Sequence, residues 1–188
     1  MPRIISGSLR GINLQTPAGT DTRPTSDRAK EALFSIIGPD LDGAKVLDLF
    51  AGSGQIAIEA LSRGAISAVL CETDRDALKA LFSNIEKTQT SGMVRVFTYD
   101  AVRLVRKLVK EKHSFDFIYL DPPWQALVSL LDKIKNYLPD LLAPAGVIVL
   151  ESEQKQAVPG SFGESLPLAR SCTYGASVLS FYYHEKVE

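Results

Sequence analysis

Residues 45–54 read Lys-Val-Leu-Asp-Leu-Phe-Ala-Gly-Ser-Gly, an apolar run that ends in a turn with two glycines. The run has the composition of a fully buried strand, and Ile56–Leu61 behind it has the spacing of a helix. Because glycine adopts backbone angles that other residues avoid, Gly52 and Gly54 allow a sharp turn and a close approach of the backbone to a ligand. This stretch predicts an α/β sheet that binds a ligand at its strand ends.

The same strand-and-helix alternation continues along the chain. Further buried strands are predicted at 68–71, 94–98, 115–120 and 146–151, and the helices between them at 75–87, 102–110 and about 127–138. Such alternation predicts a mostly parallel sheet that is covered on both faces. The last segments, 166–173 and 177–183, are separated by Gly175 and predict an antiparallel hairpin. The expected fold is therefore α/β, with a mostly parallel seven-stranded sheet of the Rossmann-like type and a C-terminal antiparallel hairpin.

The N-terminal part follows a different pattern. Short apolar pieces around glycines in residues 1–24 predict a small β-hairpin and a loop. A helix is expected from about residue 25, with Thr25 or Ser26 as its cap and Gly38-Pro39 at its end. The expected organisation is a small extension, 1–24, joined to one main domain, 25–188.

The bulk composition excludes several classes of protein. A chain of 188 residues with 45% hydrophobic residues can bury a core without disulfide or metal support. Cys71 and Cys172 lie far apart and form no zinc motif, so we expect reduced thiols and no metal. No apolar stretch has the length of a membrane span, and the first residues lack the apolar core of a signal peptide. A cytoplasmic protein is expected, and nothing demands more than a monomer.

Carboxylates follow three successive predicted strands. Asp48 can approach an ammonium group, Glu72 can accept hydrogen bonds from both hydroxyls of a ribose, and Asp100 with the Ala101 amide can bind an adenine. Taken alone, Asp48 is equally compatible with a turn cap, and Glu72 and Asp100 with solvated charges at strand ends. Together with the glycine turn, they predict a pocket for an adenosine-containing cofactor, formed by Asp48, Phe50, Gly52, Gly54, Glu72, Thr73, Asp100 and Ala101.

The fourth predicted strand ends in Asp121-Pro122-Pro123-Trp124. Two prolines fix the backbone and donate no hydrogen bonds, so the segment presents a carboxylate and carbonyl oxygens. These groups can accept the N–H bonds of an amino group on a nucleic-acid base, whose lone pair must be oriented before it attacks a methyl group. Trp124 offers a flat surface for a base that has left its stack. The four residues are the candidate catalytic residues, although a strand-to-loop turn with a core tryptophan is the structural alternative.

The glycine turn also fits the dinucleotide fingerprint G-x-G-x-x-A, so an NAD-linked oxidoreductase is a competing interpretation. The fourth strand argues against it, because the sequence shows no group for hydride transfer in place of Asp121-Pro122-Pro123.

The net charge is −1, but basic residues gather near the N-terminus. Clustered cations bind phosphates, which makes these side chains candidates for contact with RNA; an ordinary solvated surface is the alternative. The candidates are Arg3, Arg10, Arg23 and Arg28.

Taken together, these motifs resemble the bacterial 16S ribosomal RNA guanine-N2 methyltransferases of the RsmD type. The most specific pieces are residues 3–7, 22–34, 47–54 and 59–65, and residues 22–25 (Thr-Arg-Pro-Thr) separate this family from adenine-directed DNA enzymes. The resemblance implies an S-adenosylmethionine-dependent methyltransferase fold and S-adenosylhomocysteine as the product. It also implies a guanine of 16S RNA as substrate, within the 30S subunit or an assembly intermediate, and places Arg3, Arg10, Arg23 and Arg28 against that RNA.

Two residues depart from the family pattern. Trp124 stands where the family often has Tyr or Phe, which keeps stacking but loses a hydroxyl contact, and Gln55 replaces a small residue after the glycine turn. Two rival functions stay open. One is an adenine-N6 methyltransferase on RNA or DNA, and the other is a non-catalytic RNA-binding assembly factor.

Overall fold

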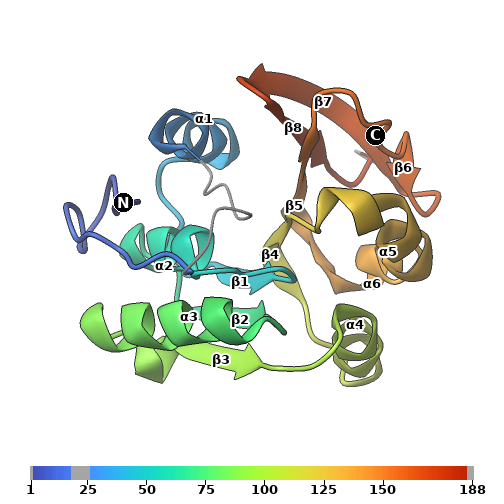
Figure 1. Cartoon of the computed structure of the whole chain (residues 1–188). Coiled ribbons are helices and arrows are strands. Elements are labelled where there is room, and N and C mark those ends of the chain that lie inside the picture. The colour runs from blue at the N-terminus through green and yellow to red at the C-terminus, as the bar shows by residue number, and fades with distance from the viewer. Residues whose placement is uncertain (1, 18–25, 186–188) are drawn as a thin grey trace.

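The computed structural model describes residues 2–17 and 26–185, which form an eight-stranded sheet between layers of helices (Figure 1). The strands are β1 (Lys45–Asp48), β2 (Ser67–Cys71), β3 (Val94–Phe97), β4 (Phe115–Leu120), β5 (Leu142–Glu153), β6 (Ser161–Phe162), β7 (Leu166–Tyr174) and β8 (Ser177–Tyr182). The helices are α1 (Asp27–Ile37), α2 (Gln55–Ser62), α3 (Arg75–Lys87), α4 (Ala101–Lys110), α5 (Leu127–Ile134) and α6 (Leu138–Leu141), with short 3₁₀ turns η1 (Ser91–Met93) and η2 (Trp124–Ala126).

The strand order in the sheet is β3-β2-β1-β4-β5-β8-β7-β6. Strands β1 to β5 run parallel, whereas β8 is antiparallel to both β5 and β7. The predicted parallel sheet with a C-terminal hairpin is confirmed; β6, a two-residue strand, is an addition to the seven strands expected. The order reverses between β1 and β4, which is where a sheet of this kind opens a crevice beyond its strand ends.

Two predicted boundaries were wrong. The single helix expected over 127–138 is divided into α5 and α6, because Pro139 lies in the first turn of α6 and cannot donate the hydrogen bond that a continuous helix requires. Strand β5 begins at Leu142 and not at Gly146, since Leu142 already pairs with Phe115 ahead of an irregularity in the ladder.

Helices cover both faces of the sheet, with α1, α2 and α3 on one side and α4, α5 and α6 on the other (Figure 1). Alternate strand residues enter the two cores, as the pleat requires. Val46, Phe117 and Tyr119 belong to the core beneath α1 and α2, whereas Leu47 and Ile118 belong to the other.

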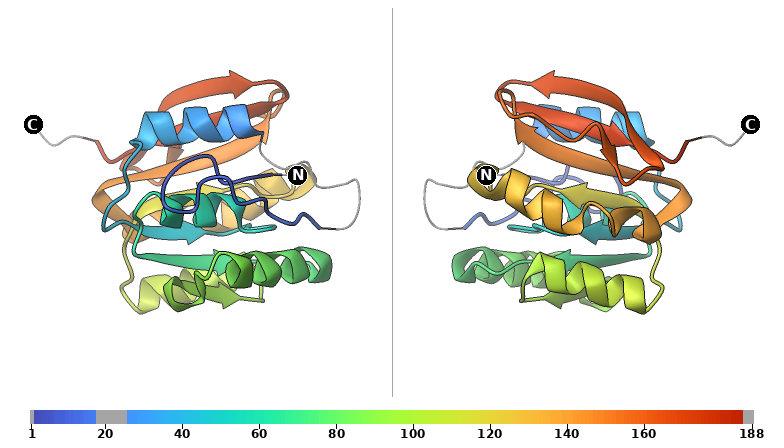
Figure 2. Two further views of the ribbon diagram at one scale, coloured as in Figure 1. Left: turned by 90° about the vertical axis from the view of Figure 1, so that its left-hand side faces the viewer. Right: turned by 90° about the vertical axis from the view of Figure 1, so that its right-hand side faces the viewer.

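The N-terminal segment lies across α2 (Figure 2, left). Ile4 and Leu14 are fully buried against Ile58 of this helix, and every residue of α2 is therefore buried. A bridge between Arg3 and Asn13 gives the segment the turn of the predicted hairpin, without regular strands. At Gly7 a Cβ atom would lie 1.7 Å from the Ser62 carbonyl oxygen, so only glycine allows this close approach.

Buried polar side chains fix this segment, and we call them the N-terminal polar cluster: Lys30, Glu59, Ser62, Arg63 and Asn84. Glu59 accepts hydrogen bonds from the backbone amides of Ile5 and Ser6, at 2.8 and 3.0 Å, and from Arg63 Nε at 3.0 Å. Lys30 Nζ donates to the Arg3 carbonyl oxygen at 2.5 Å. The predicted boundary at residue 24, and Thr25 as a cap, lie outside the described residues; Ser26 caps α1 by accepting from the Ala29 amide.

Candidate active site

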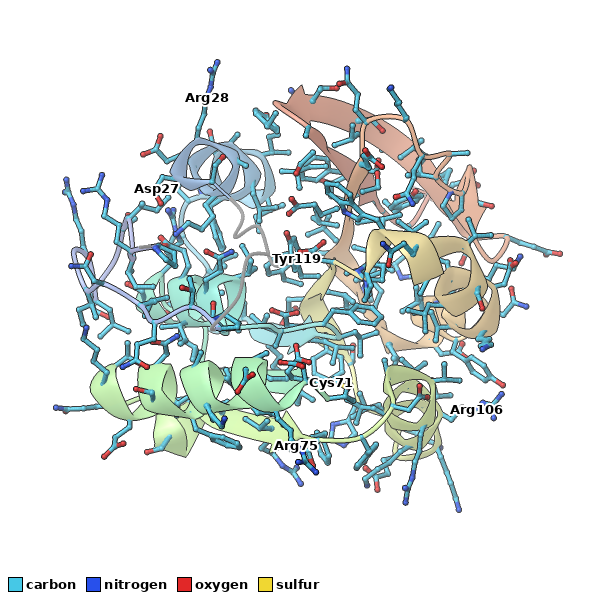
Figure 3. All side chains as sticks on the ribbon, viewed as in Figure 1. Asp27, Arg28, Cys71, Arg75, Arg106 and Tyr119 are labelled. Carbon is cyan, nitrogen blue, oxygen red and sulfur yellow. The ribbon has the colours of Figure 1, made fainter. Side chains whose placement is uncertain are left out.

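A cavity of about 760 Å³ opens beyond the carboxyl ends of the parallel strands. Tyr119 and Cys71 line this cavity and lie in the interior between the two groups of helices (Figure 3). The cavity brings together the predicted cofactor residues, apart from Gly54, and the whole predicted catalytic segment: Asp48, Phe50, Gly52, Glu72, Thr73, Asp100, Ala101, Asp121, Pro122, Pro123 and Trp124.

Gly54 has a structural role and lies outside the part of the cavity wall that the described residues form. It is the N-cap of α2 with φ 79°, in the left-handed region that favours glycine. A Cβ atom there would lie 2.5 Å from Leu81 Cδ1 on α3. The second glycine of the turn thus lets α2 and α3 pack closely. The sequence had instead predicted that Gly54 allows a ligand to approach the backbone.

Backbone amides hold the carboxylate of Glu72. One oxygen accepts from the Gly52 amide at 2.8 Å, and the other accepts from the amides of Thr73 and Asp74 at 2.6 and 2.8 Å. The glycine turn after β1 and the end of β2 are therefore joined through one side chain that also lines the cavity. Its predicted contact with a ribose stays a prediction.

Asp100 caps α4 and lines the cavity. Its Oδ1 accepts from the amides of Val102 and Arg103 at 2.9 and 3.2 Å. The structural alternative for this residue was a solvated charge at a strand end; in the structure it caps α4 and lines the cavity beside Ala101.

Asp48 is buried at the end of β1, with 1% of its surface exposed. Burial raises the pKa of Asp48 to about 7; the negative charge of Glu72 adds to this, and a hydrogen bond from the Phe50 amide at 3.3 Å opposes it. At neutral pH this carboxyl group is poised between its two protonation states.

The diproline corner continues from β4 into η2. Pro122 is buried, Pro123 is exposed, and Trp124 is half-buried in the cavity wall, so the alternative of a tryptophan inside the core is wrong. The Trp124 carbonyl oxygen accepts a hydrogen bond from Gln156, which fixes the corner against the loop after β5. Burial raises the pKa of Asp121 well above its usual value, and the negative charges of Glu151 and Asp48 raise it further.

Sequence reasoning missed two residues of this wall. Glu151, 4% exposed in β5, lines the cavity, and the Tyr119 hydroxyl donates a hydrogen bond to it. Together with Asp48 and Asp121 it forms what we call the carboxylate cluster. The signal was present, because Glu151 ends the fifth predicted strand as Asp48 ends the first, and Tyr119 precedes Asp121 by two residues and so shares its side of the strand.

The far side of the cavity comes from α1 and the C-terminal hairpin. Ser26, the N-cap of α1, and Ala29 of α1 line the cavity together with Tyr174 of β7 and Ser177 of β8. Gln55, at the start of α2, is buried, and its Oε1 has no hydrogen-bond partner among the residues that the structure describes. A buried acceptor in a cavity wall is suited to a donor on a ligand.

Three of the arginines predicted to contact RNA, Arg3, Arg10 and Arg28, are absent from the cavity lining that the described residues form. Arg3 and Arg10 are exposed on the N-terminal segment, and Arg3 pairs with Asp27 at 3.1 Å. Arg28 projects outward from α1 (Figure 3) and lies close enough to Tyr174 for its charge to influence that hydroxyl. Arg23 lies outside the described residues.

Residues 2–17 and 26–185 contain neither a candidate metal site nor a candidate membrane-spanning helix. No group of three or more His, Cys, Asp or Glu side chains has an arrangement that can hold a metal ion. No helix in these ranges has the length and apolar character needed to cross a membrane.

Comparison with known proteins identifies the family. A family described as "Conserved hypothetical protein 95" matches residues 2–183. The chain belongs to this family. Among curated relatives, "Putative rRNA methyltransferase YlbH" of Bacillus subtilis is 40% identical over 182 residues, covering 96% of this chain and 97% of that protein.

Further members of the family agree in sequence and structure. "Ribosomal RNA small subunit methyltransferase D" of Escherichia coli K12 is 37% identical over 159 residues, covering 84% of this chain and 77% of the relative. A solved structure, "Putative methyltransferase yhhF from Escherichia coli", superposes with a TM-score of 0.81 at 35% identity and 98% coverage of both chains. The predicted fold class and the predicted family are confirmed.

Proposed function

We propose that this protein transfers a methyl group from S-adenosylmethionine to the exocyclic N2 amino group of a guanine in 16S ribosomal RNA. It is an enzyme of rRNA modification. Relatives across almost the whole chain carry the names of rRNA methyltransferases, and one of them is named for the small subunit.

The observation that carries the proposal is the continuity of the cavity. The same space reaches from the glycine turn and Glu72 to the corner at Asp121 and Trp124. A methyl donor and an acceptor base need to meet in one water-poor site, and holding two reactants together lowers the barrier by up to about 7–11 kcal/mol.

The residues present fit S-adenosylmethionine. Asp48 and the Gln55 oxygen offer acceptors for its ammonium group, Glu72 offers a carboxylate for the ribose, and Asp100 with Ala101 borders the space for the adenine. The raised pKa values of Asp48 and Asp121 mark a site that stabilises added positive charge. When bound, S-adenosylmethionine supplies an electrophilic methyl group on a cationic sulfur and leaves S-adenosylhomocysteine as the product.

The diproline corner orients the acceptor. The Asp121 carboxylate and the Pro122 carbonyl oxygen accept the two N–H bonds of the guanine amino group, which aims its lone pair into the cavity. Nearby positive charge returns Asp121 to its ionised form, so that it can accept these bonds and then take up the proton that the amine loses. Trp124 stacks on the extruded base, a contact worth about 1–3 kcal/mol.

The N-terminal extension, 1–24, and the first helix present Arg3, Arg10, Arg23 and Arg28 to the RNA, while residues 25–188 carry the reaction. The substrate is the 30S subunit or an assembly intermediate, and the protein acts on it as a monomer in the cytoplasm. Arginines provide the phosphate contacts of such an interface.

The test is incubation of the protein with labelled S-adenosylmethionine and 30S particles that lack this modification, followed by nucleoside analysis. We expect label in N2-methylguanosine of 16S RNA. Label in N6-methyladenosine would favour the adenine-directed alternative, and a particle without label would favour a non-catalytic assembly factor.

A further inference from the structure

The Watson–Crick edge of guanine presents one N–H bond in addition to the amino group that the diproline corner holds. The Watson–Crick edge of guanine carries three N–H bonds, two on N2 and one on N1, whereas the same edge of adenine carries two on N6 and a bare acceptor at N1. Asp121 and the Pro122 carbonyl oxygen account for two of the three guanine bonds. A guanine bound in a site closed to water needs a third acceptor, because an unpaired buried donor is costly.

Glu151 stands next to Asp121 and can supply the acceptor for the N1–H bond. Leu120 of β4 and Leu150 of β5 are paired in the sheet, so the residues that follow them, Asp121 and Glu151, stand side by side at the carboxyl ends of neighbouring strands. The negative charge of Glu151 acts on Asp121, and both residues line the cavity. The Tyr119 hydroxyl donates to Glu151 Oε2 and so fixes the orientation of the carboxylate.

The environment of Glu151 is poorly suited to a purely structural role. It is 4% exposed, and its negative charge acts on Asp121, which the charge of Asp48 also reaches. Burying like charges together destabilises a fold, and apolar residues of similar volume would pack at this position at lower cost. A ligand that offers hydrogen-bond donors removes this disadvantage.

We propose that Glu151 is the specificity-determining residue for guanine, accepting the N1–H bond of the base that Asp121 and Pro122 hold by its amino group. A carboxylate at this place also repels the N1 lone pair of adenine. This inference rests on the proposed function and adds to it the residue that selects the base.

The test uses 2-aminopurine, which keeps the amino group of guanine but has a bare acceptor at N1. Particles are reconstituted with guanine or 2-aminopurine at the modified position, and kcat/KM is measured for both. We expect the wild-type protein to prefer guanine by roughly 10- to 100-fold, the range of one hydrogen bond to a charged group. Glu151→Gln, whose amide donates to N1, should reduce this preference to about threefold or invert it.

The matched control is Glu153→Gln, the same change two residues further along β5 and outside the described cavity lining. It should leave the preference unchanged, and S-adenosylmethionine affinity by calorimetry verifies that both variants are folded. The missing O6 of 2-aminopurine affects all proteins equally, so it cancels when preferences are compared.

The outcomes separate the two proposals. If the wild-type protein methylates guanine but accepts 2-aminopurine equally well, or if Glu151→Gln slows both substrates by the same factor, Glu151 does not read the base, while the proposed function stands. If the wild-type protein leaves guanine unmethylated in these particles, both proposals are overturned.

Discussion

Two groups of charged side chains lie on the same face of the sheet and differ in how their charges are compensated. In the N-terminal polar cluster, Glu59 meets Arg63 and two backbone amides, and Lys30 meets a carbonyl oxygen and Asp27. The carboxylate cluster at the cavity contains three acidic residues, Asp48, Asp121 and Glu151. Burial raises the pKa of Asp48 and of Asp121, and the negative charges of Glu151 and Asp48 raise the pKa of Asp121 further.

The difference separates charges that serve folding from charges that serve binding. A buried ion pair with complete hydrogen bonding attaches a segment of chain at little net cost, whereas buried charges of one sign gain their balance from a ligand of the opposite sign. We therefore expect substitutions in the first cluster to lower stability and substitutions in the second to lower binding or turnover.

The largest effect is expected for Asp121→Ala. Turnover on 30S particles should fall by about 10²- to 10⁴-fold, because the residue orients the acceptor and receives its proton. The affinity for S-adenosylmethionine by calorimetry should change little. The free energy of unfolding should stay equal or rise, since a like-charged neighbour of Glu151 is removed. A large fall in the free energy of unfolding would show that Asp121 serves folding, as the N-terminal polar cluster does.

Glu59→Ala should have the reverse profile. Removing one partner of a buried charge cluster leaves Arg63 and the amides of Ile5 and Ser6 without their acceptor, and the free energy of unfolding should fall by about 3–5 kcal/mol in a urea titration. Glu111→Ala, which breaks an exposed pair with Lys107, is the control and should cost less than about 1 kcal/mol. Equal losses for the two variants would contradict the assignment.

Glu72→Ala tests the cofactor half of the cavity. We expect S-adenosylmethionine to bind more weakly by about 1.5–3 kcal/mol, the range of hydrogen bonds to a charged group. Asp76→Ala, nearby on α3 but exposed and paired with Lys79, should leave affinity unchanged. An unchanged affinity for Glu72→Ala removes this residue from the ribose contact.

The pKa of Asp48, raised to about 7, predicts a pH dependence. Below pH 7 the group is protonated in the unliganded protein, and a cationic ligand has to displace that proton. Affinity should therefore fall as the pH drops from 8 to 6, approaching tenfold per unit below pH 7, and binding should release protons into the buffer. Asp48→Asn should lose this dependence.

The same shift has an opposite consequence for the unliganded fold. Between about pH 4 and pH 7 the folded protein keeps a proton on Asp48 that the unfolded chain has lost. The contribution of this group to stability therefore falls as the pH rises through that range. Denaturant titrations of the wild-type protein and Asp48→Asn at pH 5.5 and 8 measure it; parallel pH profiles of the two would show that Asp48 titrates normally.

The smallest effect is expected for Arg28→Ala, on the exposed surface of α1. Loss of one phosphate contact should weaken RNA binding modestly and reduce the slope of log K against log salt by about 0.7–0.9. Lys79→Ala, on the exposed surface of α3, is the matched control. If both variants keep the wild-type slope, Arg28 does not contact an RNA phosphate.

The fold was largely predictable because its signals are local. Strand β4 and helix α3 have the bounds expected from their apolar patterns, and the parallel order follows from their alternation. The exceptions arise where local patterns compete with another constraint. Pro139 divides a continuous apolar periodicity, and Leu142 extends β5 because a neighbouring strand offers a partner.

The candidate site was predictable in part. Each residue at a strand end that sequence reasoning selected, from Asp48 to Asp121, lines the cavity, because parallel strands end at the same edge. Gly54 was predicted to face the ligand, but it packs against Leu81. The sequence could not show this, because the two residues are far apart along the chain. Glu151 was missed although it ends a predicted strand, whereas the place of Tyr174 in the wall depends on how β7 and β8 pair.

The sequence by itself determined the alternation of strands and helices, the glycine turn and the diproline corner, because each depends on backbone preferences and apolar spacing within a few residues. Only the tertiary structure decided which charges are balanced. Glu59 and Glu151 both follow apolar residues in the sequence and are both buried, yet one meets an arginine and two amides and the other meets a tyrosine and a neighbouring carboxylate. Electrostatic environment depends on distances between segments far apart along the chain, and the folded sheet fixes those distances.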